Sequence, residues 1–174
     1  MADTHTVARV ALAATGDANV ATGLPVLDHL VGALARAGRL KVALEVAPDS
    51  VDEQAAAAGR SFGRALGELV RADRAAGTGW AMATADEAFA AASLEAADRP
   101  LLAANVEFSG QRVAGIATDV VSRFLEELAG GAGLNLHVRL FEGDDPQHVL
   151  LALFKAVGAA AGLACRPPHE GGEG

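Results

Sequence analysis

Two stretches decide the fold, LARAGRLKVALEVAPD (34–49) and LAGGAGLNLHVRLFEGD (128–144), because they carry one pattern twice. Each begins as the end of an apolar helix, passes a glycine, continues as a strand-like alternation and closes on an acidic turn. Phe62 in FGRALG and Phe154 in FKAVG add a second match, so the unit recurs after about 95 residues. The repeat indicates an internal duplication of a strand–helix unit. Chance similarity between two segments rich in Ala and Leu is the alternative.

The flanking residues predict the remaining elements. Alternating apolar residues favour strands at 6–13, 19–22, 40–46, 80–84, 89–95, 101–108 and 134–141. Helical spacing favours helices at 24–37, from about 51 to 74, at 119–129 and at 148–161. Ser50 or Asp52 would cap the second helix, Thr118 or Asp119 the third, and Asp145 the fourth.

These elements predict an α+β fold of two similar halves, each a four-stranded sheet backed by two helices, with the halves packed helix to helix. The first half would span residues 1–76 and the second 77–162, joined at the glycine-containing loop 75–79. Residues 163–174 are expected to form a disordered tail, because CRPPHEGGEG is a terminal segment rich in Gly and Pro.

Composition and charge exclude several classes of partner. The 174 residues carry a net charge of −8, whereas binding to a nucleic-acid backbone needs a basic face. No apolar run reaches the roughly 18 residues of a membrane span, and the first residues lack the pattern of a signal peptide. The single Cys165 rules out an internal disulfide framework and suits a reducing compartment. We therefore expect a cytoplasmic protein with no nucleic-acid and no membrane partner.

The five histidines do not form a local metal-binding motif, because none has the spacing of H-E-x-x-H or H-x-x-E-H. The G-x-S-x-G motif of serine hydrolases and the glycine-rich phosphate loop are both absent. Asp28 and His29 stand out because they interrupt the apolar stripe of a predicted helix. A polar side chain at such a position usually has a partner or a role.

Five segments in order resemble motifs of the imidazoleglycerol-phosphate dehydratase family of histidine biosynthesis. TGLPVLDHL (22–30) resembles T-G-x-P-x-x-D-H-M, and ADEA (85–88) resembles M-D-E-A. TDVVSRFLEELA (118–129) resembles T-E-L-V-x-E-F-F, AGLNLHVRL (132–140) resembles A-G-I-T-L-H-I-R-L, and HVLLALFKA (148–156) resembles H-x-x-E-x-x-F-K-A. The resemblance covers most of the chain and implies the family's duplicated fold, of the ribosomal S5 domain 2-like type.

The resemblance also implies a metal site. The family uses two manganese ions, which bind the imidazole of the substrate while water leaves its glycerol chain. His29, His137 and His148 match three of the family's histidine ligands. They would be the metal ligands of this chain, as vestiges of the full set.

Five further residues match functional positions of the family. Asp86 and Glu87 match an acidic pair near the reacting carbons, and Asp3 stands where the family has a glutamate that acts as acid or base. These three are the candidate catalytic residues. Arg112 and Lys155 match substrate-binding positions, Arg112 at one for the phosphate.

The other metal ligands that the resemblance would assign are absent. Where the family has H-H-x-x-E-D, this chain has DEQAAA (52–57), and Gln147 and Leu151 replace a further histidine and a glutamate. A catalytic metal needs at least three protein ligands, so the three remaining histidines are too few for two ions. We therefore expect no cofactor, or at most one weakly bound divalent metal. A manganese pair is expected only if the chain is active.

Three functions fit this pattern. A non-catalytic homologue would have a structural role, bind a ligand, or pair with an active paralogue. An active dehydratase would need Asp52 and Glu53 as replacement ligands, since carboxylates bind manganese well. A changed activity on another small anionic substrate would use the acidic pair with Arg112 and Lys155. We favour the first, and because the family forms trimers that join into a larger shell, we expect a homo-oligomer, trimeric or higher.

Overall fold

The strand at Leu40–Glu45 shows why these sequences form sheets, because Leu40, Val42 and Leu44 are buried and the residues between them are exposed. The computed structural model describes residues 5–107, 110–113 and 115–169. The first half contains β1 (Val7–Leu12), β2 (Asp17–Ala21), α1 (Pro25–Gly38), β3 (Leu40–Glu45) and α2 (Val51–Val70). The second half contains β4 (Thr78–Ala85), β5 (Ala88–Ala96), β6 (Leu101–Ala104), β7 (Arg112–Val113), β8 (Ile116–Ala117), α3 (Thr118–Ala132), β9 (Leu134–Glu142) and α4 (Pro146–Ala164).

The two halves repeat one sheet topology. In the first half β3 is central, antiparallel to β1 and parallel to β2. In the second half β9 is central, antiparallel to β5 and parallel to β6. The predicted α+β fold of two similar halves is therefore confirmed.

The number of strands differs between the sheets. The second sheet has four strands, as expected, because β4 pairs with the outer edge of β5. The first sheet has three strands in the described part of the chain, one fewer than expected. The reason is that no described segment pairs with the outer edge of β1.

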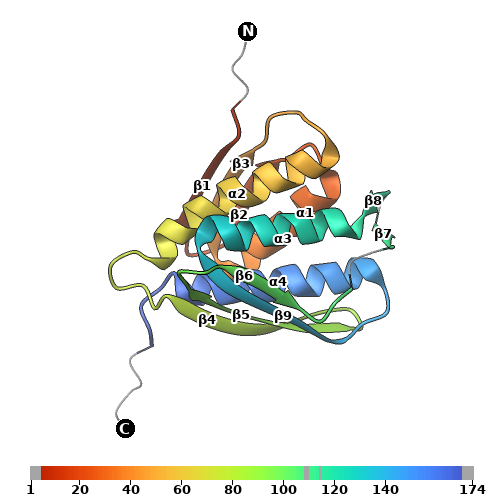
Figure 1. Cartoon of the computed structure of the whole chain (residues 1–174). Coiled ribbons are helices and arrows are strands. Elements are labelled where there is room, and N and C mark those ends of the chain that lie inside the picture. The colour runs from red at the N-terminus through yellow and green to blue at the C-terminus, as the bar shows by residue number, and fades with distance from the viewer. Residues whose placement is uncertain (1–4, 108–109, 114, 170–174) are drawn as a thin grey trace.

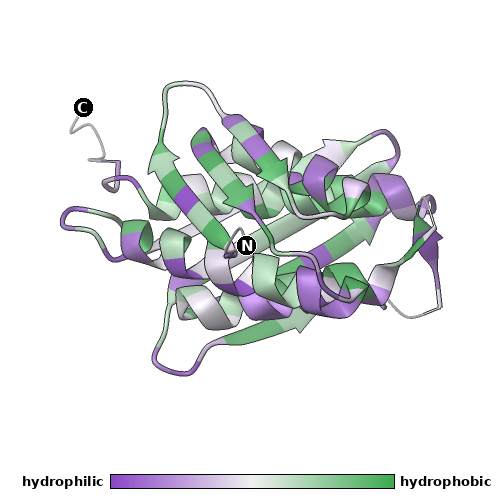
Figure 2. Cartoon of the chain, turned by 90° about the horizontal axis from the view of Figure 1, so that it is seen from above, coloured by the Kyte–Doolittle hydropathy of each residue, from purple (hydrophilic) through white to green (hydrophobic). Residues whose placement is uncertain are grey.

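The helices lie between the two sheets, which form the outer layers of the molecule (Figure 1). α1 and α2 contact the first sheet, and α3 and α4 contact the second. Across the boundary α2 packs on α3 and α1 packs on α4, so the halves meet helix to helix as predicted. Figure 2 shows hydrophilic and hydrophobic residues alternating along strands, as expected where one sheet face is covered and the other exposed.

Glycines let the helices approach each other backbone to backbone. A Cβ atom at Gly63 of α2 would lie 2.5 Å from the Leu128 carbonyl oxygen on α3. A Cβ atom at Gly158 of α4 would lie only 2.1 Å from the Leu34 carbonyl oxygen on α1. Both distances are far inside van der Waals contact, so only a residue without a side chain fits at either place.

This packing corrects one part of the predicted repeat. Because Leu34 and Leu128 are equivalent in the repeat, Gly63 and Gly158, which contact them, are equivalent as well. The predicted match of Phe62 with Phe154 is therefore wrong by about one helical turn.

The third helix is longer than predicted. It continues through two glycines to Ala132, whereas the sequence led us to end it at 129. A Cβ atom at Gly131 would lie 2.7 Å from the carbonyl oxygen of Arg60 on α2. Gly131 is therefore a site of close helix contact and not a helix stop.

Three buried phenylalanines join the halves. The ring of Phe124 on α3 stacks on Phe62 of α2, with centroids 6.3 Å apart, and on Phe154 of α4, with centroids 5.8 Å apart. All three side chains are fully buried. The stack therefore links helices of both halves in a single core.

Two of the three predicted helix caps are confirmed. The Ser50 hydroxyl accepts a hydrogen bond in the first turn of α2, and the Asp145 carboxylate does so in the first turn of α4. The prediction for α3 is wrong, because neither Thr118 nor Asp119 caps it. The Thr118 hydroxyl instead donates to the carbonyl oxygen of Gln111, 3.4 Å away.

The predicted tail begins later than expected. α4 continues to Ala164, and Cys165 behind it is buried, which raises the pKa of its thiol to about 11. The Arg166 guanidinium donates hydrogen bonds to backbone carbonyl oxygens of Ala13, Gly38, Arg39 and Gly162. Residues 163–166 therefore belong to the folded body. Residues 170–174 of the predicted tail lie outside the described residues.

Among the described helices, α4 alone has the length and apolar composition that a membrane span requires. Its most apolar window has a mean hydropathy of 1.4, but 67% of that window is buried. α4 contacts α1, β4 and β5, so its apolar surface is used inside the protein. It is a core helix.

Candidate functional site

Three of the predicted site residues meet where β4 turns into β5 beside the start of α4. Glu87 Oε2 lies 2.6 Å from His148 Nδ1, and Asp86 Oδ2 lies 3.3 Å from His148 Nε2. Glu87 Oε1 also accepts a hydrogen bond of 2.9 Å from the backbone N–H of Asp145. The turn between the strands is tight, and Asp86 has a left-handed φ of 48°. We refer to this group as the Asp86–Glu87–His148 cluster.

Each partner in the cluster favours the charged form of the other. The backbone hydrogen bond from Asp145, followed by the hydrogen bond with His148, lowers the pKa of Glu87 to about 2. The hydrogen bond to Glu87 in turn raises the pKa of His148 above its ordinary value. Because the folded-state pKa of His148 is raised and that of Glu87 is lowered, the contact stabilises the fold most between their ordinary pKa values, where both groups are charged, and its contribution falls as Glu87 becomes protonated in acid. On the alkaline side the contribution is lost as the pH rises through the raised pKa of His148.

We expect an NMR titration of the His148 ring to give a pKa above the ordinary value of about 6.5. Glu87→Gln removes the hydrogen-bonding carboxylate and should bring the pKa of His148 down. Asp86→Asn is the matched control, because Asp86 acts on His148 only through a weaker charge interaction. A pKa of His148 that is the same in wild type and Glu87→Gln would contradict the assignment of this pair.

His29 lies in a different place. Its side chain is exposed on α1 and lines a pocket of about 220 Å³ together with Gln147 at the start of α4. The rest of the pocket wall is apolar and consists of Pro25, Val26, Leu30, Val113 and Leu150. The pocket therefore offers one imidazole and one neutral amide among apolar side chains.

The start of α2 offers no obvious replacement ligand. Glu53 Oε1 lies 2.5 Å from Arg60 Nη2, two turns further along the helix, and Arg60 also pairs with Glu127 of α3 at 3.5 Å. The side chain of Asp52 lines an open hollow between α2 and α3. Ala56, one turn on from Asp52, is fully buried. The Glu53 carboxylate is therefore already used in an ion-pair network between the halves.

The remaining predicted site residues are dispersed. His137 is exposed on β9, where it is paired in register with Ser93 of β5. The Lys155 ammonium donates to the backbone carbonyl oxygen of Thr84 at 2.6 Å, and the Arg112 guanidinium donates to that of Gly115 at 2.6 Å. Asp3 lies outside the described residues. Of the predicted site residues that the structure describes, only Asp86, Glu87 and His148 come together within one chain.

The Asp28-His29 pair has a structural explanation that the sequence did not reveal. Asp28 Oδ1 accepts a hydrogen bond of 2.9 Å from the Thr22 backbone N–H and one of 2.5 Å from the Thr22 hydroxyl. Thr22 is fully buried, so Asp28 satisfies polar groups at the entry to α1. The sequence held a hint of this contact, because Thr22 and Asp28 belong to the same motif, TGLPVLDHL (22–30).

The described residues do not suit a two-metal centre within one chain. No group of three or more His, Cys, Asp and Glu side chains among residues 5–107, 110–113 and 115–169 is arranged to hold a metal ion. Both ring nitrogens of His148 face carboxylates, whereas a metal ligand must offer one nitrogen lone pair to the ion. A metal at His148 would have to displace Asp86 or Glu87 first.

Comparison with known proteins gives one consistent result. Residues 22–161 match the family model described as imidazoleglycerol-phosphate dehydratase. The imidazoleglycerol-phosphate dehydratase of Desulfitobacterium hafniense is 33% identical over 173 residues, covering 94% of this chain and 86% of the relative. That of Pelobacter propionicus is 31% identical over 165 residues, covering 90% and 83%. The crystal structure of the Staphylococcus aureus dehydratase superposes with a TM-score of 0.81 over 91% of both chains, at 23% identity.

Proposed function

The chain belongs to the imidazoleglycerol-phosphate dehydratase family, and from this premise we propose that it is a member that holds no manganese pair and does not catalyse the dehydration. It keeps the family's fold and has a structural, ligand-binding or partner role in the cytoplasm. The observation that carries the proposal is the apolar wall around His29 and Gln147.

That wall disfavours a bound ion for a physical reason. A divalent cation loses its hydration shell on binding and needs several charged or strongly polar ligands in return. The pocket supplies one imidazole, one neutral amide oxygen, and five apolar side chains. Leu151, where the resemblance would place a carboxylate, packs against the hydrophobic core.

The start of α2 supports the same proposal. A replacement site would need Glu53 to leave Arg60, to which it is bound at 2.5 Å. Arg60 would then face Glu127 alone, at 3.5 Å. Asp52 alone is a single carboxylate side chain, fewer than the three protein ligands that a catalytic ion needs.

An active enzyme with a rearranged metal site is the second candidate. The Asp86–Glu87–His148 cluster favours it, because two carboxylates and an imidazole within hydrogen-bond distance are groups that can move a proton. Relatives about 30% identical carry the name of the dehydratase, a carbon–oxygen lyase. In this candidate Asp52 and Glu53 would have to serve as ligands.

Purified protein dialysed against manganese is expected to retain no stoichiometric manganese on elemental analysis, and to show no turnover of imidazoleglycerol phosphate. Without the ion, the anion that develops on the substrate imidazole has no electrophile to stabilise it, so the largest electrostatic contribution to catalysis is missing. The Desulfitobacterium hafniense dehydratase, treated in the same way, is the positive control.

Two manganese ions per chain together with turnover would refute the proposal in favour of the second candidate. The double variant Asp52→Ala, Glu53→Ala would then have to abolish both manganese binding and turnover. A single zinc or nickel ion that His29→Ala or His148→Ala removes, without turnover, agrees with the proposal.

A further inference from the structure

The pocket beside His29 has an apolar floor and a polar rim, and we call it the His29 pocket. Leu30, Val113 and Leu150 form the floor and are 2%, 8% and 2% exposed. His29 and Gln147 are exposed and lie at the rim. The pocket lies between the halves, because His29 is on α1 of the first half and Gln147 is on α4 of the second. An apolar cavity with a few polar groups is the usual form of a small-molecule site.

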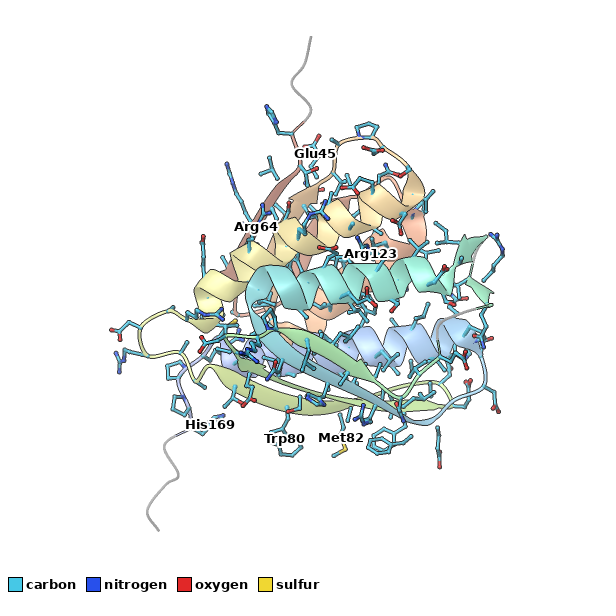
Figure 3. The ribbon with its side chains drawn as sticks, viewed as in Figure 1. Glu45, Arg64, Trp80, Met82, Arg123 and His169 are labelled. Atoms are coloured by element: carbon cyan, nitrogen blue, oxygen red, sulfur yellow. The ribbon has the colours of Figure 1, made fainter. Side chains whose placement is uncertain are left out.

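The duplication places a second hollow at the equivalent position. The helix match set by the close glycine contacts makes Arg123 the equivalent of His29, and Asp52 the equivalent of Gln147. Both line the hollow of about 420 Å³ between α2 and α3, and Figure 3 labels Arg123 on α3. The other residues that line this hollow are mostly polar or charged: Val106, Glu107, Asp119, Ser122 and Glu126. The fold therefore does not require apolar residues at this place, and the apolar floor of the His29 pocket needs another explanation.

The lining of the His29 pocket disfavours a charged ligand. None of the described residues that line it is Asp, Glu, Lys or Arg. An ion that entered the pocket would lose hydration without gaining an oppositely charged partner, which is costly in an apolar site. A neutral molecule instead gains by covering the apolar floor. Its one polar group can bond at the rim, where the imidazole of His29 and the amide of Gln147 both donate and accept hydrogen bonds.

The volume of the pocket sets the size of the ligand. The pocket encloses about 220 Å³, which is more than the roughly 150 Å³ of an engineered cavity that binds benzene. In proportion to benzene, it holds about nine non-hydrogen atoms, the size of indole. A flat ring system of this size is rigid, so it loses less conformational freedom on binding than a flexible alkyl chain does.

We propose that the His29 pocket binds a small neutral aromatic molecule of one or two fused rings. The ring covers the apolar floor, and one polar atom on its edge forms a hydrogen bond to His29 or Gln147. Such binding rests on the proposed function, because a metal ion at His29 would bring charge and bound water into the same space. It gives the ligand-binding role of the chain a chemical class.

The test is isothermal titration of indole into the full chain after metal has been removed with a chelator. Wild type is expected to bind one indole per chain, with a dissociation constant on the order of 100 µM for a ligand of this size. Val26→Asp should weaken binding about tenfold, because Val26 lines the pocket and the ring would desolvate the new carboxylate.

Val120→Asp is the matched control. Val120 is the equivalent valine of α3, is half-buried as Val26 is, and is not among the residues that line the His29 pocket. This variant makes the same change in the fold and should alter the affinity for indole by less than about twofold.

A second comparison needs no substitution of a buried residue. Indene has the shape of indole without its N–H group, so it should bind wild type about 3–10-fold more weakly, the effect of one hydrogen bond. In the double variant His29→Ala, Gln147→Ala, indole and indene should bind equally. Both side chains are exposed, so the far-UV circular dichroism should not change.

Four results would overturn the proposed ligand: no saturable binding of indole to wild type, no effect of Val26→Asp, equal weakening by Val120→Asp, or indene bound as tightly as indole. All four leave the proposed function intact, because it depends on manganese content and turnover. Two manganese ions per chain with turnover would instead refute the proposed function, and indole binding to the metal-free chain would still report on the pocket.

Discussion

Gly63→Ala is expected to lower the free energy of unfolding by about 3 kcal/mol, although alanine is the better helix former. The added methyl group would lie 2.5 Å from the Leu128 carbonyl oxygen and 3.0 Å from the Ala132 nitrogen. These are backbone atoms of α3, so no side-chain rotation relieves the clash. The helices would have to separate, and the buried contacts between the halves would loosen.

Gly130→Ala is the control, because Gly130 lies in α3 with no atom within 4 Å of the added Cβ. This variant should raise the free energy of unfolding by about 0.5–1 kcal/mol through helix propensity alone. Urea denaturation followed by circular dichroism measures both. If the two variants changed stability in the same direction, the close packing of α2 on α3 would be incorrect.

Phe124→Ala is expected to cost about 3–5 kcal/mol of stability. Phe124 is fully buried and is the middle ring of the stack with Phe62 and Phe154, so its removal leaves a cavity that touches three helices. Phe124→Leu keeps most of the apolar volume and should cost much less. Thermal or urea unfolding gives the comparison, and a loss below about 1 kcal/mol for Phe124→Ala would exclude the stack as a central part of the core.

Local patterns predicted most of the secondary structure. The alternation at 40–46 and the helical spacing at 24–37 are properties of neighbouring residues, and they correspond to β3 and α1. The caps Ser50 and Asp145 could also be predicted locally, since a capping side chain bonds to the first turn of the helix that it begins.

The errors in the predicted structure arose where contacts between residues far apart in the sequence determine the local structure. Gly130-Gly131 looks like a helix stop, but Gly131 is placed against the backbone of Arg60, 71 residues earlier. Glu87 and His148 are 61 residues apart, and no pattern in either segment shows that they touch. The sequence named both as site residues only through the family resemblance, and their hydrogen bond had to come from the fold.

The way the helices cross between the halves has a consequence for the origin of the chain. If the two halves are exchanged, the contact of α2 with α3 becomes the contact of α4 with α1. The close approach of Gly63 to Leu128 likewise becomes the close approach of Gly158 to Leu34. The two contacts are thus copies of one interface related by an approximate two-fold axis. A half on its own would leave its glycine-lined helix uncovered, and a second copy of that half would cover it in the same way. The present chain is, in its architecture, a homodimer whose two subunits became one gene product.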